Sequence, residues 1–214
     1  MTGGRAPDAD PLRAALSTSP PEAAEALLGA RLVVPAEGIE AAIVEVEAYG
    51  GPEGSPWPDP GAHTWPGPTA RNAVMFGPAG HLYVYRSYGL HHCANVTCGP
   101  DGVGGGVLLR AVRVDAGLDA VRGRRGDVPL ARLSAGPGNV AGALGITLED
   151  YGSDLCDDAS RIRLLPAPDA VPAGAVRRGP RVGLRRASQR PWRLWLAGER
   201  VSAYRAHPRG DGLE

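Results

Sequence analysis

The segment from Ile43 to Gly51 combines an apolar strand pattern with two carboxylates and a tyrosine. In a β-strand, where side chains alternate between faces, Glu45, Glu47 and Tyr49 share one face, opposite apolar residues that face the core. We interpret Glu45 as part of an exposed sheet face. We expect Glu47, which lies beside Tyr49 and a diglycine turn, at the rim of a cleft, where a carboxylate can act as a general base.

Aromatic residues cluster in one part of the chain. Four of the six tyrosines lie between positions 49 and 88. Tyr83 and Tyr85 share one face of a predicted strand, and Tyr88 follows at the tip of a predicted hairpin, where a large ring has little of its own chain to pack on. Aromatic faces can stack on an extruded nucleobase, and a protruding ring can fill the gap left in a duplex.

The histidines and cysteines do not form a familiar metal pattern. His91, His92 and Cys93 are consecutive, but side chains of neighbouring strand residues point to opposite faces, so His92 could not share a metal with the other two. The sequence has no CxxC pair and no HExxH. We therefore expect no metal and no organic cofactor, and interpret His91 and His92 as surface or DNA-facing residues of the hairpin.

The elements that must position these residues follow from local signals. Ser19, the prolines after it and Gly29 predict a short helix. Strands are predicted at 31–35 and 39–49, followed by a Pro- and Gly-rich loop over 50–70, of a length that is usually functional. Further predicted elements are a hairpin over 81–98, a strand after glycines 104–106, a helix within 134–146, and final strands RLWLAG and ERVSAY. These short links between strands predict an α+β fold with a curved, mostly antiparallel sheet flanked by helices.

Length and charge limit the remaining possibilities. The 214 residues suit a single domain, which we assign to 11–206, with a disordered N-terminus (1–10) and a flexible tail (207–214). The total charge is zero, but residues 161–214 carry a net charge of +8, which could contact phosphates or simply be solvated. Three cysteines, no apolar leader and no run long enough to cross a membrane lead us to expect an intracellular, cytoplasmic and nucleoid-associated protein.

Several blocks of the chain, in order, resemble the alkyladenine (3-methyladenine) DNA glycosylase family of the human type. The blocks are VEVEAYGGPE, GAHTWPGPTARNAVMFGPAGHLYVYRSYGLHHCANV, GGVLLRAV, SAGPGNVAGALGI and RVGL, and they extend from about Leu27 to Tyr204. The resemblance implies a single-domain mixed fold whose protruding β-hairpin enters the DNA minor groove.

The resemblance also implies a role for particular residues. It implies that Glu47 is the general base, that Tyr88 enters the duplex in place of the flipped nucleotide, and that Asn95 screens bases sterically. The other implied roles are walls of the base pocket for Tyr49, His63 and Tyr85, and contacts to the nucleophilic water for Arg110 and the main-chain carbonyl of Val182.

The implied activity is that of a monofunctional DNA glycosylase. Such an enzyme flips alkylated or deaminated purines out of double-stranded DNA, hydrolyses the N-glycosidic bond and leaves an abasic site for base excision repair; we expect it to act as a monomer. The chain has no lysine to form a Schiff base. The residues alone leave two alternatives open, a nucleoside hydrolase acting on free small molecules and a non-catalytic nucleic-acid-binding module.

Overall fold

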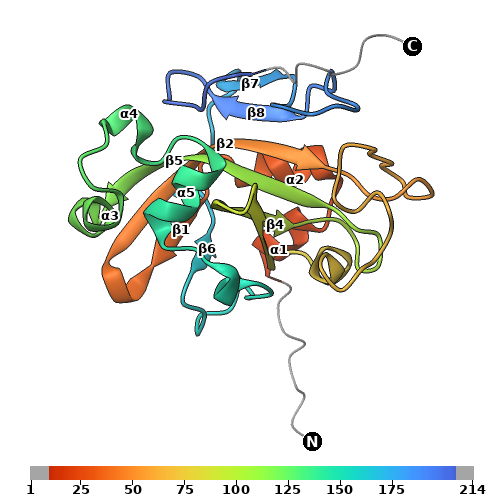
Figure 1. Cartoon of the computed structure of the whole chain (residues 1–214), viewed down its shortest axis with the longest axis horizontal. Helices are drawn as coiled ribbons and strands as arrows, with labels where there is room; N and C mark the ends of the chain where they lie inside the picture. Colours follow the sequence, from red (N-terminus) through yellow and green to blue (C-terminus); the bar gives the residue numbers. More distant parts are fainter. Residues whose placement is uncertain (1–9, 206–214) are drawn as a thin grey trace, which may run out of the picture.

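The two longest strands, β2 (Ile39–Tyr49) and β5 (Gly106–Ala116), pair antiparallel at the centre of the sheet in the computed structural model, which describes residues 10–205 (Figure 1). The eight-stranded sheet has the order β3-β4-β5-β2-β1-β6, and β8 pairs with β2 and β7. The remaining strands are β1 (Arg31–Val34), β3 (Leu82–Ser87), β4 (His91–Thr97), β6 (Arg163–Leu165), β7 (Val176–Gly179) and β8 (Arg193–Leu196). The predicted α+β fold with an antiparallel sheet is confirmed.

Strand β2 changes partners along its length. Its first half pairs with β1, whereas Glu45–Glu47 pairs with β8, and β5 runs along the opposite edge of both halves. The register with β5 shifts on both sides of Glu45, which marks a β-bulge. Bulges change the direction in which side chains point and are common beside active sites. The segment that carries both carboxylates is thus covered on both edges and locally irregular.

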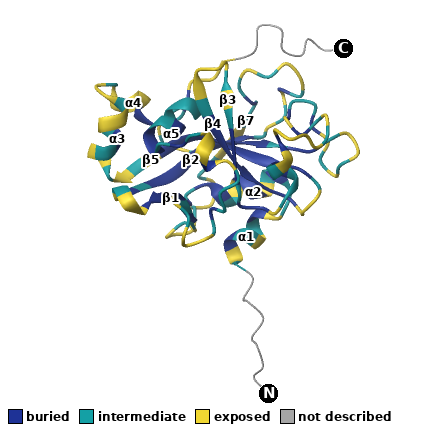
Figure 2. Ribbon diagram, turned by 60° about the horizontal axis from the view of Figure 1, so that its bottom comes forward, coloured by how far each residue is buried: buried dark blue, intermediate teal, exposed yellow. Residues whose placement is uncertain are grey.

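Two of the helices pack against the central strands of the sheet. Helix α2 (Pro20–Leu27) begins at the predicted cap Ser19, which forms a capping box with Glu22, and it packs on β2 and β5. Helix α5 (Pro137–Leu144) packs on β4 and β5. The other helices are α1 (Pro11–Leu16), α3 (Leu118–Arg125), α4 (Leu130–Leu133) and the 3-10 helices η1 (Pro35–Glu37), η2 (Ala73–Phe76) and η3 (Leu148–Asp150). Figure 2 shows the buried residues along the central strands and the exposed ones mainly on loops and outer helices.

Most predicted elements are present, and one is not. The helix after Ser19, strands β1, β2, β5 and β8, the β3–β4 hairpin and the helix within 134–146 are confirmed. The strand predicted for ERVSAY is wrong, because residues 200–204 have no regular structure and Ser202 instead hydrogen-bonds Glu45. The predicted terminal segments 1–10 and 207–214 lie outside the described residues, apart from Asp10, which caps α1.

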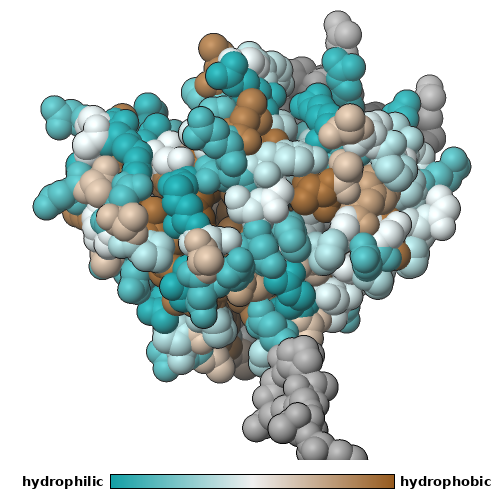
Figure 3. All heavy atoms as spheres, turned by 90° about the horizontal axis from the view of Figure 1, so that it is seen from below, coloured by the Kyte–Doolittle hydropathy of each residue, from teal (hydrophilic) through white to brown (hydrophobic). Residues whose placement is uncertain are grey.

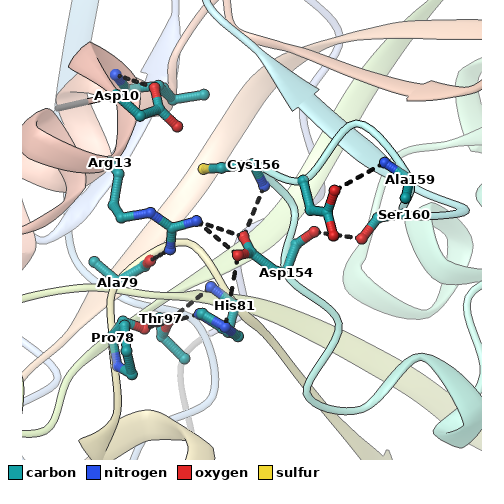
Figure 4. Close-up of polar contacts among 12 residues, drawn as sticks. Asp10, Arg13, Pro78, Ala79, His81, Thr97, Asp154, Cys156, Ala159 and Ser160 are labelled. Carbon is teal, nitrogen blue, oxygen red and sulfur yellow. Dashed lines mark hydrogen bonds and ion pairs between the residues drawn. The ribbon is translucent and has the colours of Figure 1, made fainter. Parts of the chain in front are cut away.

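A cluster of polar residues joins α1 to the segment that precedes β3 (Figure 4). Arg13 donates from Nη2 to both carboxylate oxygens of Asp154 at 2.7 Å and from Nη1 to the carbonyl of Ala79 at 2.5 Å. Asp154 also accepts from the main-chain N–H of Cys156 at 3.0 Å. Burial alone would raise the pKa of Asp154, but the hydrogen bonds from Arg13 and Cys156 outweigh it and lower that pKa.

The described residues contain no helix long and apolar enough to cross a membrane. On the face shown in Figure 3, hydrophilic side chains predominate and the hydrophobic ones form small, separate patches.

The ion pair between Arg13 and Asp154 should contribute stability that depends on pH. A carboxyl whose pKa is lowered by folding stabilises the protein above its unfolded pKa, and this stabilisation is lost as the pH falls through the folded value. We expect Asp154→Asn to lower the free energy of unfolding by about 1 kcal/mol at pH 7, since the pair is partly exposed, and by less at pH 3. Urea unfolding at both pH values measures this. Asp158→Asn, at a carboxylate that is 92% exposed, is the control; equal losses in both variants would contradict the expectation.

Candidate active site

The carboxylate of Glu47 is completely buried near the end of β2, where three donors reach it. The Tyr49 hydroxyl and Arg110 Nη1 donate to Oε2 at 2.8 and 3.2 Å, and the main-chain N–H of Val182 donates to Oε1 at 2.7 Å. A carboxylate can accept about four hydrogen bonds, so Oε1 can accept a further donor. The structure therefore brings together four of the predicted site residues. Val182 reaches Glu47 through its N–H, which is a different group from the main-chain carbonyl that the resemblance assigns to the water.

Glu45 is not on an exposed face, and that prediction was wrong. Its side chain is completely buried and accepts from Arg110 Nε at 3.1 Å, from Arg193 Nε at 2.7 Å, and from the N–H and hydroxyl of Ser202 at 2.6 and 2.8 Å. The physical reason is that residues 200–204, together with the Arg193 side chain of the edge-paired β8, cover the face of β2 that carries both carboxylates. Strand alternation predicted which face Glu45 shares with Glu47, but not that another segment covers this face.

Arg110, on β5, lies between the two carboxylates and keeps its charge. Burial by itself would lower the pKa of its guanidinium, but the charges of Glu47 and Glu45 outweigh burial and raise that pKa. The pKa of Tyr49 is raised well above its ordinary value, first by burial and then by the negative charge of Glu47. The Tyr49 phenol therefore remains protonated and donates its hydrogen bond to Glu47.

A pocket opens on the other side of Tyr49. It contains about 380 Å³ of space free of protein atoms, part of it open to solvent. The residues that line it are Tyr49, Gly61, His63, Met75, Tyr85, Asn95 and Leu184. The four residues predicted for the base pocket are thus all present, whereas Gly61, Met75 and Leu184 were not predicted. Glu47 does not line the pocket; its carboxylate lies behind the Tyr49 hydroxyl, and its charge contributes to raising the pKa of Tyr85, although burial is the main cause.

His63 is held at the mouth of this pocket by two tyrosines. Its ring meets that of Tyr85 edge-on, with centroids 4.5 Å apart, and its Nδ1 lies 3.0 Å from the hydroxyl of Tyr83. Although the residue is exposed, this packing partly desolvates the ring and, together with the charge of Arg71, lowers the pKa of His63. The imidazole is therefore neutral at pH 7. Tyr83, which sequence reasoning placed only on a strand face, thus positions His63.

The β3–β4 hairpin carries Tyr88 at its tip, as predicted. The side chain is 96% exposed, and the residue has a φ of 50°, followed by Gly89 at 69°. Consecutive positive φ angles are typical of two-residue hairpin turns, and a non-glycine residue there is uncommon. Asn95, on β4 of the same hairpin, is buried at the other end and faces the pocket.

A buried ion pair, without any local pattern to predict it, lies behind the pocket wall. Arg181 and Asp59 are both completely buried, and the guanidinium donates to the two carboxylate oxygens at 2.5 and 2.8 Å. The same guanidinium lies 4.7 Å from the centre of the Tyr49 ring and donates to the carbonyl of Ala48 at 3.0 Å. Asp59 also accepts hydrogen bonds from the N–H groups of Gly50 and Gly61. These two bonds hold the beginning of the long loop against the segment that leads to His63.

This pair connects three segments that are far apart in the sequence, namely the end of β2, the loop that leads to His63 and the segment that carries Val182 and Leu184. Each segment contributes a residue to the pocket or a donor to Glu47. Arg181 begins the RVGL block, but Asp59 lies outside the blocks that carry the resemblance, and a buried pair 122 positions apart leaves no local pattern.

Within residues 10–205, no group of three or more histidine, cysteine, aspartate or glutamate residues is arranged to hold a metal ion. Cys93 and Cys98 are buried free thiols, and burial raises the pKa of each.

Fold and site together define a class of protein. A buried, hydrogen-bonded carboxylate directly behind a pocket of aromatic rings is the arrangement expected of a hydrolase that holds a planar ring next to a general base. Comparisons with known proteins identify the family within this class. The model of the methylpurine-DNA glycosylase (MPG) family matches residues 14–200.

Individual relatives are similar over almost their whole length. A protein of Nocardia farcinica (strain IFM 10152) is 55% identical over 202 residues, which cover 92% of this chain and 92% of that protein. A protein of Mycolicibacterium paratuberculosis is 54% identical over 197 residues, covering 91% and 93%. Both carry the name "Putative 3-methyladenine DNA glycosylase". The chain therefore belongs to the methylpurine-DNA glycosylase family, which confirms the family and the enzyme class predicted from its sequence.

Because Arg181 and Asp59 are buried together, loss of one charge should be costly. We expect Asp59→Asn to lower the free energy of unfolding by about 3–5 kcal/mol, since it leaves a buried guanidinium without its counter-charge. Urea unfolding at pH 7 measures the loss. Asp101→Asn, on an exposed turn, should change stability by less than about 0.5 kcal/mol. A loss in Asp59→Asn no larger than in this control would show that the pair does not support the loop.

Proposed function

We propose that this chain is a monofunctional glycosylase that acts as a monomer on double-stranded DNA, rotates a damaged purine out of the helix and hydrolyses its N-glycosidic bond. The observation that carries the proposal is the buried Glu47 carboxylate, hydrogen-bonded to the hydroxyl of Tyr49 directly behind an aromatic pocket. Membership of the methylpurine-DNA glycosylase family supports DNA as the substrate.

In this proposal the extruded base stacks between Tyr49 and the side of the pocket formed by His63 and Tyr85. Because burial and Arg71 keep His63 neutral, it does not repel a purine that alkylation has made positively charged. Such a base gains cation–π attraction of about 0.5–2 kcal/mol over a normal base. Asn95 lines the same pocket, with its amide nitrogen 3.5 Å from the carbonyl of Tyr83, and in this proposal its side chain would crowd the exocyclic amine of guanine.

The chemistry uses a water molecule held between Glu47, Arg110 and the main-chain carbonyl of Val182. Glu47 accepts a proton from this water as its oxygen bonds to the anomeric carbon of the sugar. The carbon–nitrogen bond breaks, and its electron pair leaves with the purine. A cationic alkylpurine departs as a neutral base, whereas a neutral purine departs as its anion and then takes a proton from solvent water. The negative charge of Glu47 also stabilises the oxocarbenium-like transition state, and the product is an abasic site.

DNA contact is proposed for the surface that joins the pocket to the hairpin. Tyr88 projects from the tip and would occupy the space of the rotated nucleotide. The groove between the tip and the pocket is lined by Arg71, Arg86 and Tyr85. Two guanidinium groups there suit the phosphates of the strand that carries the lesion. An enzyme acting on free nucleosides would have no use for Tyr88 or for this groove.

Replacing the proposed base should stop catalysis without preventing binding. We expect Glu47→Gln to lower the excision rate at least about 100-fold, since a positioned general base contributes about 10²–10⁴ in rate. The assay uses a duplex with one 7-methylguanine or one hypoxanthine, followed by alkali to cleave at abasic sites, with duplex affinity measured in parallel. Glu53→Gln, at an exposed carboxylate of the long loop, is the matched control. Absence of base release by the unaltered protein would indicate the non-catalytic module instead.

Replacing the tip residue should affect duplex substrates selectively. We expect Tyr88→Ala to lower kcat/KM on a fully paired lesion about 10-fold or more, and less on a mispaired lesion, whose extrusion costs less. Because the ring is 96% exposed, the thermal midpoint should stay close to that of the unaltered protein. Leu118→Ala, at an exposed position of α3, serves as the control. If the unaltered protein and Tyr88→Ala both hydrolyse free nucleosides efficiently, the alternative of a nucleoside hydrolase is favoured.

A further inference from the structure

Glu45 is a completely buried charged group, beside Glu47, that the proposed reaction does not use. It accepts hydrogen bonds from two guanidinium groups and from both donors of Ser202, and none of its surface is exposed. Buried ion pairs of this kind are poor sources of stability, because apolar residues of similar volume often serve as well. The charge of Glu45 therefore needs an explanation other than folding alone.

The hydrogen bonds of Arg110 give that explanation. Each of its three guanidinium nitrogens has a different acceptor: Nε donates to Glu45 at 3.1 Å, Nη1 to Glu47 at 3.2 Å and Nη2 to the hydroxyl of Ser202 at 2.8 Å. Two of these three contacts belong to the cluster formed by Glu45 and Ser202. Glu45 and Ser202, rather than Glu47, therefore set the orientation of the Arg110 guanidinium.

The charges around these residues balance only when Glu45 is counted. Arg110 and Arg193 face Glu45 and Glu47, two positive groups against two negative ones, and Arg193 is held by Glu45 Oε1 at 2.7 Å and by the carbonyl of Ser202 at 2.9 Å. Without the charge of Glu45, Arg110 would have Glu47 as its one neighbouring carboxylate in this cluster. Arginine pairs with a carboxylate most strongly through two parallel hydrogen bonds, and such a pair would occupy the lone pairs that Glu47 needs for the water proton.

We propose that Glu45 is a positioning residue, which holds Arg110 in a single hydrogen bond to Glu47 and so keeps Glu47 able to accept a proton from water. Glu45 touches neither substrate nor water and acts through Arg110. The inference rests on the proposed function, in which Glu47 is the general base. It adds a reason for two carboxylates on one strand, one of which does the chemistry while the other prevents Arg110 from neutralising it.

The test compares two glutamates of the same strand. We expect Glu45→Gln to lower the single-turnover excision rate on a duplex with one hypoxanthine about 10- to 100-fold, since a small misplacement of a catalytic group can cost about 100-fold in rate, with duplex affinity within about twofold of the unaltered protein. Glu40→Gln, at a partly exposed residue of β2 paired with Arg31 at 3.1 Å, should match the unaltered protein in both measurements. A purely structural role predicts parallel losses of folded fraction, affinity and rate.

If Glu45→Gln does not fold, a second variant tests the positioning role of Glu45. Ser202→Ala removes the hydroxyl that accepts from Arg110 and donates to Glu45 but leaves every charge in place. We expect a smaller loss of rate, about 3- to 10-fold, because Arg110 is displaced less when the charges remain, again with affinity unchanged. Folded variants with full excision rates, or with losses of affinity equal to those of rate, would overturn the inference. If the unaltered protein releases no base from this duplex, the proposed function fails rather than the role of Glu45.

Discussion

The organisation of the site depends on one constraint, that two carboxylates placed inside the protein must find positive partners there. Glu45 and Glu47 lie on β2, and the guanidinium groups that balance them come from β5 and β8. This requirement is met where β2 exchanges β1 for β8 midway and where residues 200–204 cross its face without forming a strand. The central sheet thus neutralises buried charge as well as packing the apolar core.

A second buried pair extends this order to segments without regular structure. Arg181 and Asp59 join the end of β2, the long loop before His63 and the segment that holds Val182. The part of the pocket wall formed by Gly61, His63 and Leu184 is built from loops, and these loops are held by hydrogen bonds to a single guanidinium that also lies against Tyr49. Loops held in this way can provide a binding site as firmly as strands do, since preorganisation depends on satisfied contacts rather than on secondary structure.

Local patterns in the sequence predicted much of the fold and part of the site. The cap at Ser19, the alternation in β2 and the hairpin around Tyr88 depend on neighbouring residues, so they could be recognised from the chain alone. The assignment of Glu47, Tyr49, His63, Tyr85, Asn95 and Arg110 to one region came from the family resemblance, and the structure brings them together.

Local patterns could not predict which residues pair over long distances in the sequence. Glu45 looked solvent-exposed because its partners Arg193 and Ser202 are about 150 positions away, and Asp59 looked like an ordinary loop residue for the same reason.

The positive φ of Tyr88 limits how the tip of the hairpin could be changed by engineering or by evolution. A left-handed backbone conformation is most costly for β-branched side chains and least costly for glycine, asparagine and a few others. Valine or isoleucine, which have the hydrophobicity for insertion into DNA, would therefore strain the turn, whereas glycine would relax it but leave nothing to insert. Only side chains that are unbranched at Cβ and also bulky satisfy both requirements, so the choice of wedge at this position is narrowed by backbone geometry before any contact with nucleic acid is made.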